Sequence, residues 1–241
     1  MSTLILVRHA QASFGAEDYD KLSELGETQS TLLGGYWVNA QTTFDQVLIG
    51  PRLRHRQTAE LAERVFRDAG HPWENTESLD KLDEYQGESL IKKALPRLIG
   101  EDTHLQNLAA AFADIDHQDP SAKRKAFQRM FEHIMRSWVR GEINEPGVES
   151  WQHFTDRITE VIRDIQQRFG RKQTVVAFTS GGVVGAAVGL SFGLSPEKSI
   201  ETSWMVQNAS LTEFTFTPDR FTLSRFNALP HLQYPRLITY R

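Results

Sequence analysis

The stretch LILVRHA at residues 4–10 decides the fold class of this chain. Its first four residues form an uninterrupted apolar run, which is typical of a strand covered on both faces, and such strands belong to mostly parallel sheets. Arg8 and His9 follow this run directly. Because open α/β sheets bind ligands beyond the carboxyl ends of their strands, we expect this pair to face a binding crevice.

Working outward from this strand, the sequence predicts further strands that alternate with helices. The expected elements are a helix capped by Ser23, a strand at residues 46–49, a helix from about Arg54 to Gly70, a strand at 174–178, a small-residue helix at 183–188, and a hairpin formed by residues 211–217 and 221–226. We therefore expect an α/β fold, a three-layer sandwich in which helices flank a mostly parallel sheet and a C-terminal hairpin adds antiparallel strands.

The region between residues 84 and 174 indicates successive helices without a clear strand. One helix is expected from Asp119-Pro120 because Asp is a good cap and Pro fits the first turn. Its apolar stripe predicts the core residues Phe127, Met130, Phe131, Ile134 and Trp138. Since single α/β domains reach this length, we interpret residues 1–241 as one domain with a helical insertion at about 88–144.

The composition excludes the simplest arguments for several classes of protein. The formal net charge is −4, from 27 Lys and Arg against 31 Asp and Glu, which does not suggest a nucleic-acid or anionic-membrane binder. The chain has no cysteine, which suits the cytosol, and we read no targeting or membrane-spanning segment. No metal or nucleotide-cofactor motif is recognisable, so we expect neither a metal nor a cofactor. The sequence does not indicate the oligomeric state.

The Arg8-His9 pair has the chemistry needed to handle a phosphate ester. An imidazole can attack phosphorus, while the planar fork of a guanidinium can hold two phosphoryl oxygens. Taken alone, the pair is more typical of a surface salt-bridge arginine beside a structural histidine. The rest of the sequence is needed to choose between these interpretations.

Several motifs resemble, in order, those of the histidine phosphatase superfamily, the phosphoglycerate mutase-like proteins. Residues 8–10 resemble its Arg-His-Gly signature, with Ala10 in place of glycine. LSELGETQ at residues 22–29 looks like its Leu-Thr-x-x-Gly-x-x-Gln stretch. GPRLRHRQTA at residues 50–59 resembles Ser-x-Leu-x-Arg-Ala-x-x-Thr-Ala, with Gly50 and His55 in place of serine and alanine.

The later motifs continue the resemblance but include one important departure. LDE at residues 82–84 resembles a Leu-x-Glu element of the family. VVAFTSGG at residues 175–182 resembles Val-x-Ser-His-Gly-Gly, with Ser180 where the family has its second histidine. Smaller similarities are present at Glu149-Ser150 and at residues 208–214.

The resemblance implies a role for each candidate site residue. It implies that His9 is the nucleophile, that Arg8 and Arg54 bind phosphoryl oxygens, and that Glu84 is the general acid and base. Ser180 and the backbone N–H groups around Gly181 would also contact phosphate. Some alternatives stay open: Arg52 or Arg56 could replace Arg54, Asp83 could replace Glu84, and Ser180 could be a helix cap only.

The function that these residues predict is hydrolysis of a small phosphorylated metabolite through a phosphohistidine intermediate, with the ester or inorganic phosphate as the bound partner. A phosphoglycerate mutase is one alternative. Because a serine hydroxyl cannot become cationic, a catalytically weak phosphate-binding or regulatory protein is another. If Ser180 slows the reaction, Ser180→His should raise kcat, provided that an imidazole fits there.

Overall fold

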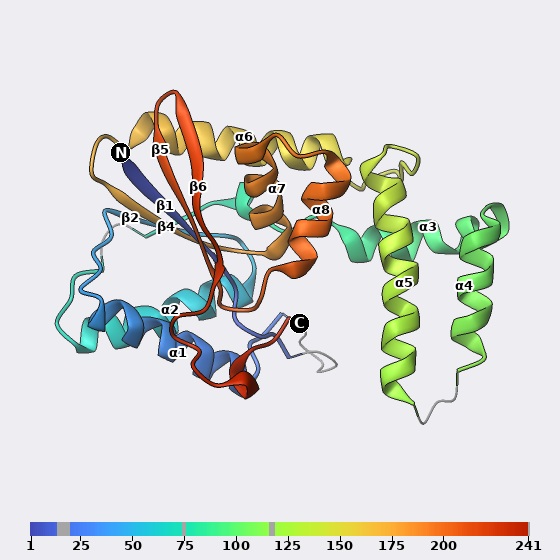
Figure 1. The fold of residues 1–241 in the computed structure, drawn as a ribbon, viewed down its shortest axis with the longest axis horizontal. Coiled ribbons are helices and arrows are strands. Elements are labelled where there is room, and N and C mark those ends of the chain that lie inside the picture. The colour runs from blue at the N-terminus through green and yellow to red at the C-terminus, as the bar shows by residue number, and fades with distance from the viewer. Residues whose placement is uncertain (14–19, 74–75, 116–118, 241) are drawn as a thin grey trace. The chain divides into compact units, whose positions relative to one another are not determined.

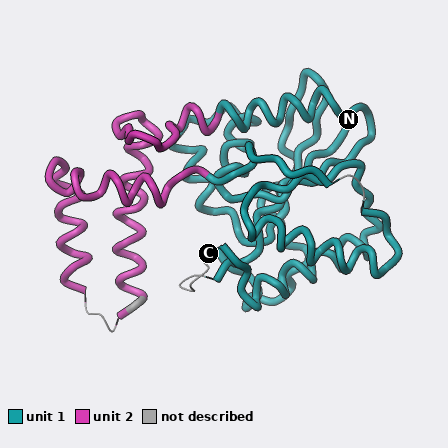
Figure 2. The backbone as a smooth tube through the Cα atoms, turned by 180° about the vertical axis from the view of Figure 1, so that it is seen from behind, with its two compact units in different colours: residues 1–84, 156–241 teal, residues 85–155 magenta. Residues whose placement is uncertain are grey.

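The computed structural model describes residues 1–13, 20–73, 76–115 and 119–240. They form two compact units, which Figure 2 colours separately. Unit 1 contains Met1–Glu84 and Asp156–Arg241, and unit 2 contains Tyr85–Thr155. All candidate site residues named from the sequence therefore belong to unit 1.

Unit 1 is built on a sheet with the strand order β3-β2-β4-β1-β5-β6. Its strands are β1 (Ser2–Arg8), β2 (Gln46–Ile49), β3 (Thr76–Ser78), β4 (Thr174–Thr179), β5 (Leu211–Thr217) and β6 (Arg220–Ala228). Strands β3, β2, β4 and β1 run parallel, whereas β5 pairs antiparallel with β1 and with β6. The predicted α/β class, with its mostly parallel sheet and antiparallel hairpin at one edge, is confirmed.

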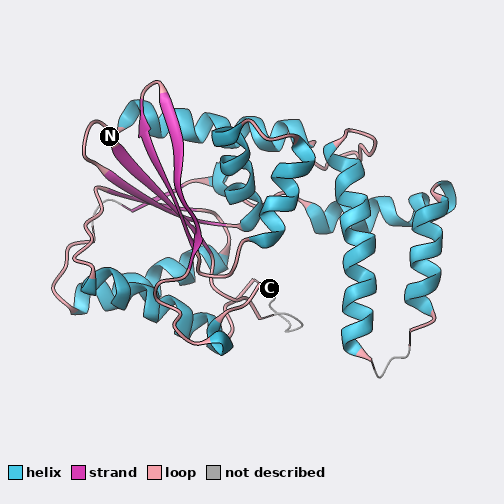
Figure 3. Ribbon diagram, in the orientation of Figure 1, coloured by secondary structure: helices cyan, strands magenta, loops and turns pink. Residues whose placement is uncertain are grey.

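The helices of unit 1 cover both faces of this sheet (Figures 1 and 3). They are α1 (Glu24–Asn39), α2 (Leu53–Asp68), α7 (Gly181–Phe192), α8 (Pro196–Met205) and the greater part of α6 (Trp151–Arg168). Ser23 caps α1 as predicted, since its hydroxyl accepts a hydrogen bond from the Gly26 N–H at 3.1 Å. The side-chain amide of Gln166 on α6 donates a hydrogen bond of 2.6 Å to the Thr217 carbonyl, where β5 ends before the β5–β6 turn.

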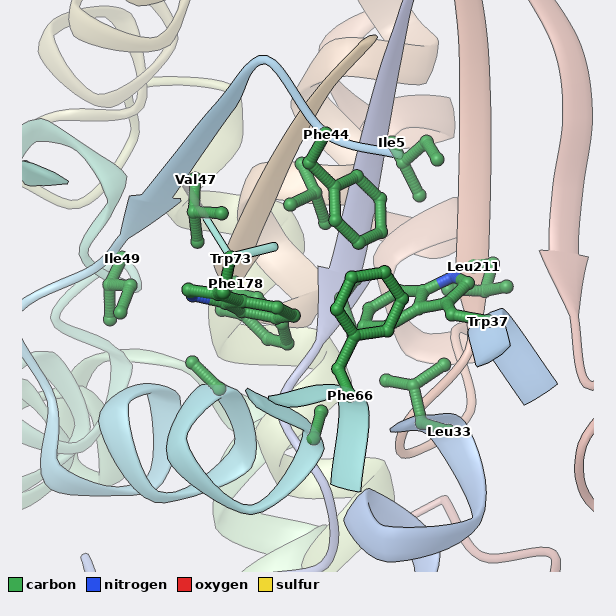
Figure 4. Close-up of a cluster of buried hydrophobic side chains, with 14 residues drawn as sticks. Ile5, Leu33, Trp37, Phe44, Val47, Ile49, Phe66, Trp73, Phe178 and Leu211 are labelled. Atoms are coloured by element: carbon green, nitrogen blue, oxygen red, sulfur yellow. The ribbon is translucent and has the colours of Figure 1, made fainter. Parts of the chain in front are cut away.

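The face of the sheet that carries α1 and α2 encloses a core of aromatic side chains (Figure 4). Trp37 from α1 meets the ring of Phe44 edge-on at 4.9 Å and that of Phe178 at 6.0 Å. Because side chains alternate along a strand, Val7 points into this core while Leu6 faces the opposite layer. The apolar runs of β1, β2 and β4 are thus buried on both faces, as their composition predicts.

Unit 2 is helical and contains α3 (Gly87–Glu101), α4 (Thr103–Ala113) and α5 (Pro120–Val139). Asp119 caps α5 as expected, accepting a hydrogen bond from the Ala122 N–H at 2.9 Å. The predicted stripe of α5 is buried only toward its C-terminal half, because Phe127 is 40 % exposed while Ile134 and Trp138 are buried. None of the described helices, in either unit, is long and apolar enough to cross a membrane.

One buried histidine of unit 1 makes stability dependent on pH. His231 is 7 % exposed, and neither ring nitrogen has a hydrogen-bond partner. Burial lowers the pKa of His231 to about 4. Between pH 6.5 and 4 the unfolded chain therefore binds more protons at this residue than the folded chain, and the free energy of unfolding must fall as the pH falls.

We expect His231→Leu to remove this loss. Between pH 7 and pH 5, the unfolding free energy of the wild type should fall by about 2 kcal/mol more than that of the variant. Urea denaturation at the two pH values would measure both. The exposed His153, replaced in the same way, is the matched control and should behave as the wild type. An equal decrease in wild type and His231→Leu would contradict the assignment.

Candidate active site

The candidate site begins where three neighbouring parallel strands end. Strand β4 lies between β2 and β1, and the residues that follow these strands are Ser180, Gly50 and His9. The His9 N–H donates to the Thr179 carbonyl at 2.8 Å. The sheet therefore places the three motifs that follow these strands side by side.

Two hydrogen bonds define the protonation state of His9. Its Nδ1 lies 2.8 Å from the Ala10 carbonyl oxygen, which can only accept, so Nδ1 carries the hydrogen. Its Nε2 lies 3.1 Å from Nε–H of Arg54, which can only donate, so Nε2 carries a lone pair. His9 is thus a neutral imidazole whose Nε2 has the electron pair that a nucleophile needs.

The electrostatics of the site favour the same state. Burial, assisted by the positive charges of Arg54 and Arg8, lowers the pKa of His9 well below its ordinary value. An unprotonated His9 is therefore the stable form at neutral pH. The two guanidiniums that lower its pKa are the groups that the sequence assigned to phosphate binding.

The backbone around His9 is fixed by residues distant in the sequence. The His9 carbonyl accepts from the Asn208 side-chain amide and from the Ala209 N–H, both at 3.2 Å. The Ala10 N–H donates to the Thr58 hydroxyl at 3.0 Å, and that hydroxyl donates to the Arg54 carbonyl at 2.6 Å. These contacts explain why the motifs of residues 50–59 and 208–214 contain a threonine and an asparagine.

The motif at residues 22–29 supports the loop that follows His9. Gln29 is fully buried; its Oε1 accepts from the Gln11 N–H at 2.9 Å, and its Nε2 donates to the Leu237 carbonyl at 2.8 Å. Position 26 has to be glycine, because a Cβ atom there would lie 2.1 Å from the Gln11 carbonyl oxygen. This motif therefore acts on the site through the backbone of the loop.

The structure distinguishes among the three arginines near the start of α2. Arg54 is 6 % exposed and contacts His9, whereas Arg56 is exposed and Arg52 pairs with Asp83. Arg54 also forms an ion pair with Asp20 at 2.7 Å. A phosphoryl group arriving at His9 Nε2 would have to replace the Arg54 contact there and offer oxygens to the same guanidinium.

We expect Arg54→Ala to lower kcat/KM by roughly 30- to 1000-fold, about 2 to 4 kcal/mol, because a charge-assisted contact to phosphate is lost. Removing this positive charge should also raise the pKa of His9 toward its ordinary value, which NMR titration would detect. Arg56→Ala is the control and should keep the wild-type rate. A large loss in Arg56→Ala with none in Arg54→Ala would show that the register is wrong.

Arg8 and Glu84 both lie near the N-terminus of α7. Arg8 donates to the Val206 carbonyl, and its Nε is 3.6 Å from the position that a Cβ atom on Gly181 would take. Glu84 accepts from the Gly182 N–H at 3.1 Å through its carboxylate. Both side chains thus reach the glycine turn after β4, where the sequence placed backbone donors for phosphate.

Glu84 and its neighbour Asp83 have different surroundings. Asp83 Oδ1 pairs with Arg52 and also accepts from the Glu84 N–H at 2.7 Å. Arg157 donates to the Asp83 carbonyl at 2.9 Å and to the Glu84 carbonyl at 3.4 Å, which fixes the backbone of this segment. The Asp83 carboxylate is committed to an ion pair, whereas that of Glu84 lies at the helix N-terminus beside the site.

Ser180 has a partner that the sequence did not suggest. It occupies the N-cap position of α7, but its side chain makes no capping hydrogen bond. Its Oγ lies 2.7 Å from Nε2 of His55, which is fully buried in the first turn of α2, and the His55 ring centroid is 5.7 Å from that of His9. The gain expected from Ser180→His, which requires room for an imidazole beside His55, stays a prediction.

Together these residues define a class of site: a neutral histidine with a lone pair on Nε2, and near it two guanidiniums, a carboxylate and a helix N-terminus. Such a set can bind a phosphoryl dianion and stabilise its transfer to nitrogen. Across the described ranges, no three His, Cys, Asp or Glu side chains are grouped so that they could hold a metal ion.

Comparison with known proteins agrees with this class. The sequence profile of the histidine phosphatase superfamily (branch 1) matches residues 4–107 and 106–229, and the chain belongs to this superfamily. A search of curated protein sequences gave no significant match.

Solved structures share the fold at low sequence identity. A mutant of phosphoserine phosphatase from Entamoeba histolytica, in complex with phosphoserine, superposes with a TM-score of 0.62 at 16 % identity, over 96 % of this chain and 100 % of the other. Bacillus stearothermophilus YhfR gives 0.64 at 15 % identity, over 97 % and 100 %. The mycobacterial glucosyl-3-phosphoglycerate phosphatase gives 0.60 at 18 % identity, over 94 % and 98 %.

Proposed function

We propose that this protein is a phosphomonoester hydrolase that acts through a phosphohistidine on His9. The observation that carries the proposal is the tautomer of His9, whose Nε2 lone pair is directed at the guanidinium of Arg54. A dianionic phosphoryl group that binds Arg54 is thereby brought to the one nitrogen of His9 that can attack it. Membership of a superfamily named for histidine phosphatases supports the same activity.

The proposed reaction has two steps. In the first, His9 Nε2 forms a bond to phosphorus as the ester P–O bond breaks, and Glu84 gives its proton to the leaving oxygen. Arg8, Arg54 and the N–H groups near Gly181 hold the phosphoryl oxygens. In the second, Glu84 takes a proton from water, whose oxygen attacks phosphorus and releases inorganic phosphate from His9.

The substrate is proposed to be a small phosphorylated metabolite. One structural neighbour holds phosphoserine, and another is named as a glucosyl-3-phosphoglycerate phosphatase, so this fold accommodates esters with different leaving alcohols. We propose that selectivity for the alcohol comes from residues other than those that hold phosphate. The cytosolic location expected from the absence of cysteine stays a prediction.

A panel of phosphate esters tests this function. The wild-type protein should release inorganic phosphate from at least one small ester, and acid-labile ³²P should be trapped on the protein by rapid quenching. A phosphoenzyme that survives for minutes and passes its phosphoryl group to a second alcohol would favour a mutase. Binding of phosphate without turnover of any ester would contradict the hydrolase.

A further inference from the structure

Three positions at which this chain departs from the motifs of its superfamily meet at one point in the structure. They are Gly50 at the end of β2, His55 in the first turn of α2, and Ser180 at the end of β4. His55 and Ser180 are both fully buried, and 2.7 Å separates His55 Nε2 from Ser180 Oγ. The missing histidine of one motif and the additional histidine of another are therefore in direct contact.

Gly50 makes this contact sterically feasible. A Cβ atom at position 50 would lie 2.4 Å from Nδ1 of His55 and 3.0 Å from the Leu82 carbonyl oxygen. Any side chain there would therefore displace the imidazole or the backbone of residue 82. The glycine leaves His55 its buried position, in which Ser180 is its hydrogen-bond partner.

We propose that His55 is a positioning residue, which holds Ser180 so that its hydroxyl hydrogen points to a phosphoryl oxygen at His9. A serine hydroxyl has a single hydrogen. His55 Nδ1 is buried and makes no hydrogen bond with the described residues, which favours a hydrogen on Nε2, where Ser180 Oγ can accept it. The serine hydrogen then remains available for the substrate, whereas a hydroxyl that donated to His55 would have none to give. The site would thus obtain its second imidazole from α2. This inference rests on the proposed function and extends it.

The geometry indicates when the pair would act. Arg54 donates a hydrogen bond to His9 Nε2, and Ser180 is fully buried. A phosphoryl group that bonds to His9 Nε2 therefore requires Arg54 to move from His9 to the phosphoryl oxygens. A donor fixed in advance is most useful while charge builds up on those oxygens, so the pair should affect kcat more than KM.

The first test replaces His55 with residues of similar volume. His55→Met, which cannot hydrogen-bond to Ser180, should lower kcat by roughly 10- to 100-fold and change KM by less than about 3-fold. His55→Gln can still donate to Ser180 and should recover most of the rate. His153→Met, at an exposed position of α6, is the matched control. A wild-type kcat in His55→Met, or no recovery in His55→Gln, would overturn the proposal.

A double-mutant cycle shows whether His55 acts through Ser180. Ser180→Ala removes one oxygen atom and should cause the same loss as His55→Met. Adding His55→Met to Ser180→Ala should then cost less than about 2-fold more, because the two residues form one unit. Independent, multiplying losses would refute the coupling. A wild-type rate in Ser180→Ala would do so even if no His55 variant could be purified.

Vanadate binding separates failure of this inference from failure of the proposed function. Vanadate resembles the phosphoryl group in the transition state of its transfer. The affinity of His55→Met for vanadate should therefore fall by about the same factor as kcat. Unchanged affinity would overturn the inference whatever the enzyme hydrolyses. Weaker binding in the variant, with no ester hydrolysed by the wild type, would overturn the function alone. A wild type that binds no vanadate would overturn both.

Discussion

His9→Ala is expected to abolish ester hydrolysis, with a loss of more than about 10⁴-fold in kcat. The reason is that His9 Nε2 carries the lone pair that we propose attacks phosphorus, whereas Nε2 of His55, the other imidazole nearby, is hydrogen-bonded to Ser180. Steady-state kinetics with the best ester of the panel would measure the loss, and rapid quenching should find no ³²P on the variant.

The variant should keep its affinity for inorganic phosphate within about one order of magnitude, because Arg8 and Arg54 remain to hold the oxygens. This separates loss of the nucleophile from loss of the site. His71→Ala, which removes a partly exposed histidine of the same unit, is the control for the substitution itself. Turnover in a purified His9→Ala sample at the wild-type rate would eliminate the phosphohistidine mechanism.

Glu84→Gln is expected to have the second largest effect, and its size should depend on the leaving group. For an alkyl phosphate, whose alkoxide needs a proton as it leaves, kcat should fall by about 10² to 10⁴. For p-nitrophenyl phosphate, whose leaving oxygen needs little assistance, phosphorylation of His9 should slow far less. Pre-steady-state measurement of that step with the two esters would show the difference.

Asp83→Asn is the matched control for Glu84, since it alters the adjacent carboxylate that pairs with Arg52. It should affect the two esters equally, because Asp83 is not assigned to proton transfer. If Asp83→Asn reproduced the leaving-group dependence while Glu84→Gln did not, the general acid would be the residue that the sequence left open as the alternative.

Much of unit 1 could be predicted because its strands are buried on both faces. Strands β1, β2 and β4 show in the sequence as short apolar runs, and the hairpin of β5 and β6 also shows in its composition. Strand β3 was missed because Thr76–Ser78 are polar. It is a short strand at the edge of the sheet and pairs with β2 on one side. Helix α8 was missed although Ser195 and Pro196 form a cap signal at its start.

The sequence could predict individual residues of the site, but not the contacts between residues that are distant in the chain. His9 follows from its place after a strand and Arg54 from the resemblance of residues 50–59 to a family motif, and the structure brings the two side chains together. The contact of His55 with Ser180, on which its proposed role rests, could not be found this way, because it depends on the spacing between the start of α2 and the end of β4. In the sequence, 125 positions separate the two residues.

The carbonyl of His9 is held by Asn208, which lies 199 positions later, and the Thr239 carbonyl accepts from the Asn208 N–H at 2.8 Å. A ribosome therefore makes the proposed nucleophile well before the residues that fix it. During synthesis the nascent chain carries His9 without its final geometry until those residues have also been made. Reactivity toward phosphate esters should accordingly appear abruptly, once the segment through Thr239 has left the exit tunnel, and not in proportion to chain length.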